Sequence, residues 1–242
     1  MSNGLDDFLP SYGEGFSYAF DNDIMLNWYP KRVMSRTQPA SAVLELGIGH
    51  GFTTNLFAQH FQRHVVIDGA PSIIEQFQRQ FPDSGAEVAC AYFENFDTEE
   101  RFDAIVMGFV LEHVDDPGLV LRRYRRFLKP GGRCFIAVPN AESLHRRFGH
   151  AAGLLPDMMA LGKGDLALGH KRLYTVESLT LEAEENGYTV VSKEGIFLKP
   201  MTTDQLRSLS LSAEILDGMC RVGIEYPELS AAFMCELVPV VS

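Results

Sequence analysis

The chain has 242 residues, 46% of them hydrophobic, and a formal net charge of −11 at pH 7. This length and apolar content allow one sizeable core, so a single domain over residues 1–242 is expected. The acidic charge argues against a nucleic-acid or anionic-membrane partner, because phosphate groups bind to basic surfaces. No apolar run approaches the roughly 20 residues that a membrane-spanning helix needs, so no membrane partner is expected.

The cellular compartment is predicted from the first residues and the cysteines. The first residues are acidic and lack a basic segment followed by an apolar one, so no export signal is visible. The four cysteines stand far apart without metal-ligand spacing, which indicates reduced core residues. A cytoplasmic protein is therefore expected.

Strand and helix patterns alternate through the middle of the chain. Short apolar strands are predicted at 42–46, 64–67, 87–91, 102–107 and 133–138. Amphipathic helices are predicted between them, at 53–62, 71–81 and 117–128. This alternation indicates right-handed crossovers and a parallel sheet that is covered on both faces. The basic cluster at 121–130 fits the solvated face of the last helix better than an RNA-binding patch.

The regular pattern breaks after residue 138. Residues 140–175 are rich in Gly, His and Arg and indicate an insertion. A helix at 176–186, a strand at 189–197, one inserted helix at 202–219 and a last strand at 231–238 follow. The expected fold class is α/β, with a doubly wound, mostly parallel seven-stranded sheet and helical insertions after strands 5 and 6.

The stretch VLELGIGHGFTTNLF at 43–57 places a carboxylate, Glu45, beside three alternate glycines, Gly47, Gly49 and Gly51. The dinucleotide fingerprint G-x-G-x-x-G would need its third glycine where Phe52 stands, and Glu45 would repel a pyrophosphate. The same carboxylate suits a nucleoside ligand that carries positive charge and no phosphate, such as S-adenosylmethionine. The alternative is an ordinary turn between a strand and a helix.

Three further motifs follow in order, VVIDGA (65–70), FDAIVMGFVLEHVDDP (102–117) and LKPGGRCFIAVPN (128–140). Together with the glycine motif they resemble class I S-adenosylmethionine-dependent methyltransferases, strongly over 40–140. The closest similarity is to the branch with ubiquinone-pathway O-methyltransferases and with sugar and natural-product methyltransferases. The resemblance implies a Rossmann-like methyltransferase fold, a cofactor-binding core at 40–140 and an acceptor-side insertion at 140–175. It also implies S-adenosyl-L-methionine as cofactor, S-adenosyl-L-homocysteine as product, and a small-molecule methyl acceptor.

The resemblance assigns roles to residues beyond the glycine motif. Asp68 would accept hydrogen bonds from the ribose hydroxyls, Gly69 and Ala70 would form the floor under the adenine, and Gly108 would leave backbone carbonyls facing the amino-acid part. The alternative for Asp68 is a cap for the helix that starts at Pro71.

The stretch after the third strand departs from the family pattern. It reads CAYFENF, with aromatic residues where an acidic side chain is expected near the adenine amino group. Phe93 is expected to stack on the adenine and Glu94 to hydrogen-bond to it, with plain core packing as the alternative for Phe93.

Two histidines are candidate catalytic bases, because methyl transfer to a hydroxyl or ammonium group requires removal of a proton. His113 follows the fourth strand and His170 ends the insertion. A histidine titrates near neutral pH and can therefore act as a base. The alternative for His113 is that it only holds its loop in place. His145 and His150 are expected on a helix surface, and no metal site is expected.

The insertion contributes basic residues to an acidic chain, and arginine suits carboxylate and phosphate geometry. We therefore hypothesise an anionic acceptor, such as a carboxylated, phosphorylated or nucleotide-linked metabolite. The alternative is that these side chains pair with nearby acids such as Asp157 and Asp165. The candidate acceptor-binding residues of the insertion are Arg146, Arg147, Lys171, Arg172 and Tyr174.

The first 38 residues are aromatic-rich and, by the resemblance, form an N-terminal helical lid segment with Tyr12 and Tyr18 as acceptor contacts; core packing is the alternative. The predicted function is methyl transfer to an oxygen or nitrogen of a small metabolite by a monomer or homodimer. The competing hypotheses are a non-catalytic S-adenosylmethionine-binding sensor or partner subunit, and an NAD-binding or nucleotide-sugar oxidoreductase, which Glu45 and Phe52 disfavour.

Overall fold

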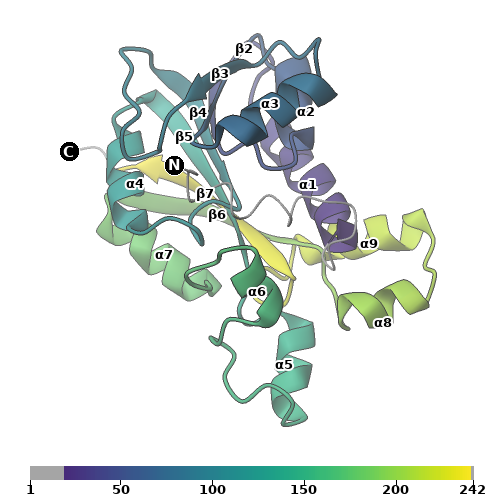
Figure 1. The fold of residues 1–242 in the computed structure, drawn as a ribbon. Helices are drawn as coiled ribbons and strands as arrows, with labels where there is room; N and C mark the ends of the chain where they lie inside the picture. Colours follow the sequence, from purple (N-terminus) through teal and green to yellow (C-terminus); the bar gives the residue numbers. More distant parts are fainter. Residues whose placement is uncertain (1–18, 241–242) are drawn as a thin grey trace.

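The computed structural model describes residues 19–240 (Figure 1). Tyr12 and Tyr18 lie outside these residues. The strands are β1 (Ala42–Leu46), β2 (Arg63–Asp68), β3 (Glu87–Cys90), β4 (Phe102–Gly108), β5 (Leu128–Pro139), β6 (Tyr188–Ile196) and β7 (Ala232–Pro239). The helices are α1 (Ala19–Met34), α2 (Phe52–His60), α3 (Pro71–Gln80), α4 (Pro117–Arg125), α5 (Leu144–Ala151), α6 (Lys163–Ala167), α7 (Val176–Glu185), α8 (Thr203–Ser208) and α9 (Ala213–Gly223).

The strands form one seven-stranded sheet in the order β3-β2-β1-β4-β5-β7-β6. Strands β1 to β5 pair in parallel, and β7 runs antiparallel to both β5 and β6. The predicted α/β fold class is therefore confirmed, and the sheet is mixed through its one antiparallel strand.

Helices cover both faces of the sheet, as the near-continuous apolar strands require. On one face, α4 and α7 pack on side chains such as Leu44 and Ile105. On the other face, α1, α2, α8 and α9 pack on side chains such as Val43 and Val106, and α3 packs beside them over Val66. Figure 1 shows these two layers on opposite sides of the strands. In the described part of the chain, no helix is long and apolar enough to cross a membrane.

The strand order places a ligand-binding crevice between β1 and β4. From β1 the chain runs outward through β2 and β3, and it then returns to pair β4 with the other edge of β1. Loops that leave the carboxyl ends of two such strands diverge, and open sheets bind ligands in the resulting gap. The residues after β1 and β4 therefore face the same space.

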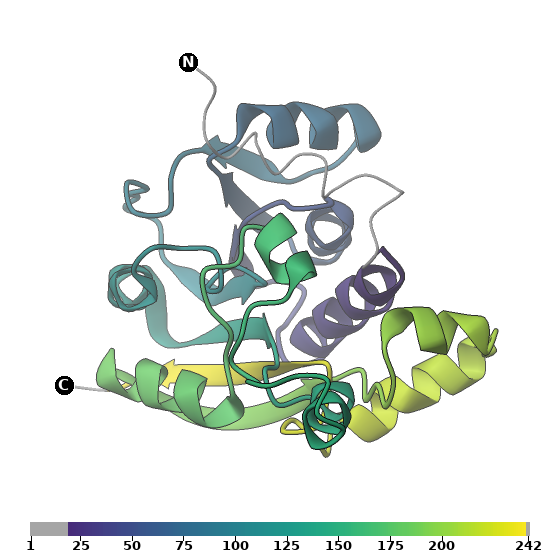
Figure 2. The ribbon, with the colours of Figure 1, turned by 60° about the horizontal axis from the view of Figure 1, so that its bottom comes forward.

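The 140–175 insertion leaves and rejoins the sheet at one point. Asn140 forms an isolated parallel bridge with Tyr174. Its side-chain amide donates to the carbonyl oxygens of Pro227, Glu228 and Ser230 at 3.1, 3.0 and 3.0 Å. Between these ends the chain forms α5 and α6, which lie in front of the sheet with α1 to one side in Figure 2. The insertion is thus closed at its base and reaches over the strand ends.

Some predicted bounds are wrong. The inserted segment at 202–219 forms two helices, α8 and α9, and not one. The break includes Ser210, whose φ of 47° lies in the left-handed region, and Ser212 is the N-cap of the second helix. Strand β5 begins at Leu128, ahead of the predicted 133, because Leu128 already pairs with Phe102 across a register shift.

Candidate functional site

One cavity of about 630 Å³ opens where the loops after β1, β2, β3 and β4 meet the insertion. It is lined by all ten residues predicted to bind the cofactor: Glu45, Gly47, Gly49, Gly51, Asp68, Gly69, Ala70, Phe93, Glu94 and Gly108. The predicted bases His113 and His170 line the same cavity. The fold therefore brings both groups of candidates together, and their individual roles stay predictions.

The glycine turn after β1 has a backbone that disfavours side chains. Gly47, Gly49 and Gly51 have φ angles of 80°, 54° and 79°, all in the left-handed region. A Cβ on Gly51 would also lie 2.8 Å from the ring of Phe77. The turn lines the cavity and leads directly into the N-terminus of α2.

Asp68, the last residue of β2, connects two loops of the cavity. One carboxylate oxygen accepts from the backbone N–H of Ile48 at 2.9 Å, and the other accepts from that of Ala70 at 2.9 Å. Burial raises the pKa of Asp68, and the backbone hydrogen bonds oppose that rise. The N-cap of α3 is Ala70, not Asp68, so the capping alternative does not describe this position. The carboxylate instead holds the glycine turn against the end of β2.

Glu45 points into the protein as well as lining the cavity. Its side chain is buried, and Oε2 lies 3.1 Å from Nε2 of His64 on β2. Burial raises the pKa of Glu45, and His64 opposes that rise. The carboxylate therefore already has a partner in the core, which the sequence did not predict.

The end of β4 lies in close contact with α1. A Cβ on Gly108 would overlap the hydroxyl of Tyr29, which is buried. The next residue, Phe109, has a φ of 59° and packs edge-on against the Tyr29 ring at 5.7 Å between centroids. Tyr29 also lines the cavity and is a site residue that the sequence prediction missed.

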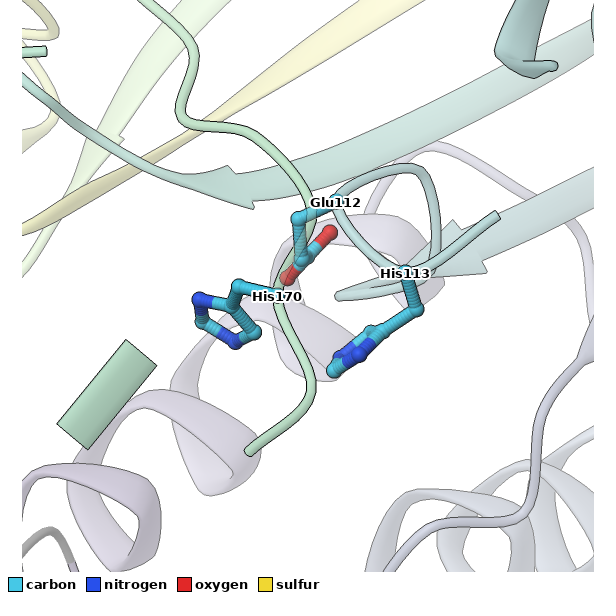
Figure 3. A group of neighbouring side chains, drawn as sticks. All are labelled: Glu112, His113 and His170. Atoms are coloured by element: carbon cyan, nitrogen blue, oxygen red, sulfur yellow. The ribbon is translucent and has the colours of Figure 1, made fainter. Parts of the chain in front are cut away.

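Glu112, His113 and His170 form a cluster at the other part of the cavity (Figure 3). The histidine rings meet edge to face with centroids 4.8 Å apart. Burial raises the pKa of Glu112 to about 7 against the opposing effect of His170. Burial and then the charge of His170 lower the pKa of His113 to about 4. Near neutral pH, His113 is therefore uncharged.

Asp165, in α6, contacts the ring of His170 from behind. Its Oδ1 lies 3.2 Å from His170 Nδ1, and its Oδ2 accepts from the N–H of Gly162 at 2.7 Å. Burial acts to raise the pKa of Asp165, but the contacts with His170 and Gly162 lower it overall. A carboxylate at Nδ1 fixes the orientation of an imidazole and leaves Nε2 for other partners.

The same cluster has one geometry that suits a metal ion. One ligand atom from each of Glu112, His113 and His170 lies within 4.8 Å of the others. Both carboxylate oxygens of Glu112 are buried and lack a hydrogen-bond partner among residues 19–240. A divalent cation has suitable ligands there, so the expected absence of a metal remains a prediction.

Of the acceptor candidates in the insertion, Arg146 and Lys171 line the cavity. The Arg146 guanidinium donates to the carbonyl oxygens of Ala141, Met158 and Ala160 at 3.0, 2.6 and 2.9 Å. Lys171 forms an ion pair with Asp115. Both side chains are therefore already engaged.

Arg147, Arg172 and Tyr174 are not among the described residues that line the cavity. Arg147 pairs with Glu142 at 2.8 Å. Arg172 donates to the carbonyl oxygens of the loop that carries His113, including that of Leu111 at 2.9 Å. Arg147 and Lys171 thus pair with nearby acids, as the alternative predicted, although the acids are Glu142 and Asp115. Arg146 and Arg172 bond to carbonyl oxygens instead.

Several cavity residues were missed by the sequence prediction. His145 was expected on a helix surface, but it lines the cavity, whereas His150 is exposed as expected. Asp21 and Lys199 also line the cavity and are buried. Glu112 lies inside the LEHV motif, and this motif is the one sequence pattern that could have predicted it. No sequence pattern predicts Asp21 and Lys199, because they meet only in the folded chain.

The fold and the cavity define an α/β protein with a candidate ligand site at the carboxyl ends of its parallel strands. A family model described as a methyltransferase domain matches residues 26–193. The chain therefore belongs to the methyltransferase-domain family, and the resemblance to class I S-adenosylmethionine-dependent methyltransferases is confirmed.

Similar sequences include ubiquinone biosynthesis O-methyltransferases. That of Xanthomonas axonopodis pv. citri is 33% identical over 113 residues, which cover 45% of this chain and 47% of the relative. That of Pseudomonas fluorescens is 27% identical over 188 residues, covering 75% and 77%. In the first of these matches, the chain spans about half the length of the relative.

Similar solved structures agree in fold. The N-methyltransferase NodS from Bradyrhizobium japonicum, in complex with S-adenosylhomocysteine, has a TM-score of 0.61 at 16% identity and covers 98% of this chain and 99% of its own. A 1,6-didemethyltoxoflavin-N1-methyltransferase from Burkholderia thailandensis has a TM-score of 0.63 at 18% identity, with 98% and 87% covered. At these identities the likeness concerns the fold alone.

Proposed function

We propose that this protein transfers the methyl group of S-adenosylmethionine to a hydroxyl or amine of a small molecule. The observation that carries the proposal is the shared cavity, which has a glycine turn and Asp68 in one part and the His170–Asp165 pair in another. Methyl transfer needs a bound cofactor and a proton acceptor that face the same enclosed space.

The cofactor part of the cavity fits a nucleoside without phosphate. The left-handed glycines leave backbone that a ligand can approach closely, and a Cβ at Gly51 or Gly108 would have no room. Asp68 keeps acceptor capacity for a ribose hydroxyl, because a carboxylate has about four lone-pair sites and the backbone N–H groups of Ile48, Gly69 and Ala70 do not fill them all. Bound there, S-adenosylmethionine would supply an activated methyl group on a positively charged sulfur.

The acceptor part of the cavity supplies a base. Asp165 holds His170 through Nδ1, so Nε2 is the nitrogen that removes the proton from an acceptor hydroxyl or ammonium. His113 stands against the His170 ring and is uncharged near neutral pH. We assign the base to His170 because it alone of the pair has a carboxylate behind it.

The charges of the cavity support an uncharged acceptor over an anionic one. The three basic residues of its described wall are engaged: Arg146 by carbonyl oxygens, Lys171 by Asp115 and Lys199 by Asp21. The acidic residues of the same wall are Asp21, Glu45, Asp68, Glu94, Glu112, Asp115, Asp116 and Asp165. An anion would meet this excess of carboxylates.

The test is incubation with S-adenosylmethionine carrying a deuterated methyl group and a metabolite extract, followed by mass spectrometry. We expect a product that gains one deuterated methyl, together with S-adenosylhomocysteine. Calorimetry with S-adenosylhomocysteine and with NAD should show binding of the first only. Binding of S-adenosylhomocysteine without any methylated product would instead support the sensor or partner-subunit hypothesis, and preference for NAD would refute the assignment.

A further inference from the structure

A second polar cluster lies in the cavity wall where α1, α5 and the segment after β6 meet. Lys199 forms an ion pair with Asp21, and its ammonium also lies 3.0 Å from the hydroxyl of Thr203. The Thr203 hydroxyl lies 2.6 Å from the same Asp21 oxygen. Asp21 and Lys199 are each only 2% exposed, and both line the cavity. His145, from α5, lines the cavity and interacts electrostatically with Lys199.

This cluster retains unused hydrogen-bonding capacity. The second carboxylate oxygen of Asp21 and Nδ1 of His145 are buried and lack a hydrogen-bond partner in the described chain. The Lys199 ammonium has three donors, and its hydrogen-bond partners there are Asp21 and Thr203. A buried polar atom without a partner costs about 1–3 kcal/mol, so such atoms in a cavity wall indicate that a ligand completes them.

We propose that Asp21 and Lys199, beside His145, recognise an uncharged head group of the methyl acceptor that carries a hydrogen-bond donor next to an acceptor, as a carboxamide does. The inference rests on the proposed function, because it concerns the molecule that is methylated in the same cavity. The N–H of the head group donates to the free Asp21 oxygen, and its carbonyl oxygen accepts from Lys199.

The balance of charge selects an uncharged head group. Asp21 and Lys199 neutralise each other, and burial lowers the pKa of His145 to about 3, so the imidazole carries no charge at neutral pH. A carboxylate would place its negative charge beside the free Asp21 oxygen, and an ammonium would place its positive charge beside Lys199. In a site shielded from water, either repulsion outweighs one additional hydrogen bond.

The competing explanation is that the ion pair only fastens α1 to α8, which pack together. That role accounts for the bond between Lys199 and Asp21. It leaves no function for the Asp21 oxygen that has no hydrogen-bond partner among residues 19–240. A purely structural pair also predicts no discrimination between head groups.

The experiment compares three probes of equal size: benzamide, benzoate and benzylamine. Their binding to the whole protein with S-adenosylhomocysteine present is measured by saturation-transfer NMR. We expect benzamide to bind at least about tenfold more tightly than benzoate or benzylamine, which corresponds to one charge-assisted hydrogen bond. Equal binding of the three probes, absence of benzamide binding, or preference for a charged probe overturns the head-group inference.

A double variant tests which residues are responsible. Asp21→Leu with Lys199→Met removes both charges together, because one buried charge left alone would destabilise the fold. The matched control is Asp103→Leu with Lys129→Met, an ion pair outside the cavity. Loss of the benzamide preference only in the cavity variant supports the inference, and its persistence there refutes the assignment to these residues.

Calorimetry with S-adenosylhomocysteine separates the two proposals. If the unaltered protein binds S-adenosylhomocysteine but does not prefer benzamide, the head-group inference fails and the methyltransferase proposal stands. If S-adenosylhomocysteine does not bind, the proposed function itself fails. The ranking of probes in the unaltered protein needs no variant, so an unstable double variant does not affect this outcome.

Discussion

The two parts of the cavity are built in different ways. The cofactor part consists of the left-handed glycine turn after β1, Glu45 on β1, Asp68 at the end of β2, the loop after β3 and the end of β4. The acceptor part consists of side chains from α1, α5, α6, the segment after α6 that carries His170, the loop after β4 and the segment after β6. The first part is therefore specified by short motifs, whereas the second depends on where distant segments meet.

This difference indicates which changes each part tolerates. A backbone site fails when its turn gains a side chain or loses its anchor, because few atoms outside the turn can compensate. A side-chain site changes its preference when single residues change, while the frame persists. The following predictions, from the largest expected effect to the smallest, test this distinction.

Asp68→Ala should abolish most cofactor binding. The change removes the acceptor for ribose hydroxyls and leaves the N–H groups of Ile48 and Ala70 without their partner. Two hydrogen bonds to a charged group correspond to about 3–6 kcal/mol, or a loss of affinity of roughly 10²–10⁴. Calorimetry with S-adenosylhomocysteine measures the loss, with the exposed Asp97→Ala as control. Unchanged affinity in Asp68→Ala would contradict the cofactor assignment.

His170→Ala should lower the rate of methyl transfer by roughly 10²–10⁴ while S-adenosylhomocysteine binds as before. Asp165→Asn should give a smaller loss of rate, because the imidazole keeps its nitrogen but loses its orienting carboxylate. Single-turnover assays of both variants and of His113→Ala provide the comparison. If His113→Ala alone reduces the rate, the base has been assigned to the wrong histidine.

Glu112→Gln should change how stability depends on pH. Burial raises the pKa of Glu112 from 4.5 to about 7, so folding favours its protonated form. The stability that this preference contributes is present below about pH 4.5 and is lost as the pH rises through about 7. Between about pH 4 and pH 8 the wild type should lose up to about 3 kcal/mol relative to Glu112→Gln.

Urea unfolding of the two proteins at both pH values, with a chelator present, measures this difference. His113 is identical in both proteins, so its own pH dependence largely cancels. A parallel decline in both proteins would show that Glu112 is not held in its protonated form.

Arg147→Ala should have the smallest effect. Arg147 pairs with Glu142 at the surface of the insertion, and a pair of this kind contributes about 0.5 kcal/mol or less. Acceptor affinity should be unchanged, as it should be for Arg172→Ala once any loss of stability is corrected. A tenfold weaker acceptor affinity in either variant would restore the anionic-acceptor hypothesis.

The sequence predicted the frame well, and the ten candidate cofactor residues do line one cavity, because both depend on local patterns. A short stretch of sequence is enough to predict each apolar strand, each crossover helix and the glycine turn, and β1 begins and ends where predicted. The acceptor part was predicted poorly. Asp21 and Lys199 are 178 residues apart, and nothing in either neighbourhood indicates that they pair.

The arginines of the insertion show a second limit of sequence reasoning. Their number suggested anion binding, but Arg146 and Arg172 bond to backbone carbonyl oxygens. Such oxygens are present at every position, so composition cannot reveal which of them an arginine will reach. The prediction of one helix at 202–219 was also wrong. Ser210, with a left-handed φ, interrupts an otherwise helical pattern there.

The closed base of the 140–175 insertion has a consequence for which segment of the chain can be exchanged. Because Asn140 and Tyr174 meet in one bridge, and Asn140 is fastened to the segment before β7, the entry and exit of the insertion coincide. A segment with adjoining ends behaves as an exchangeable unit: its interior can be shortened, lengthened or transplanted without disturbing the sheet. We therefore expect replacement of this one segment to alter the part of the cavity around His170 and to leave the sheet and the glycine turn intact.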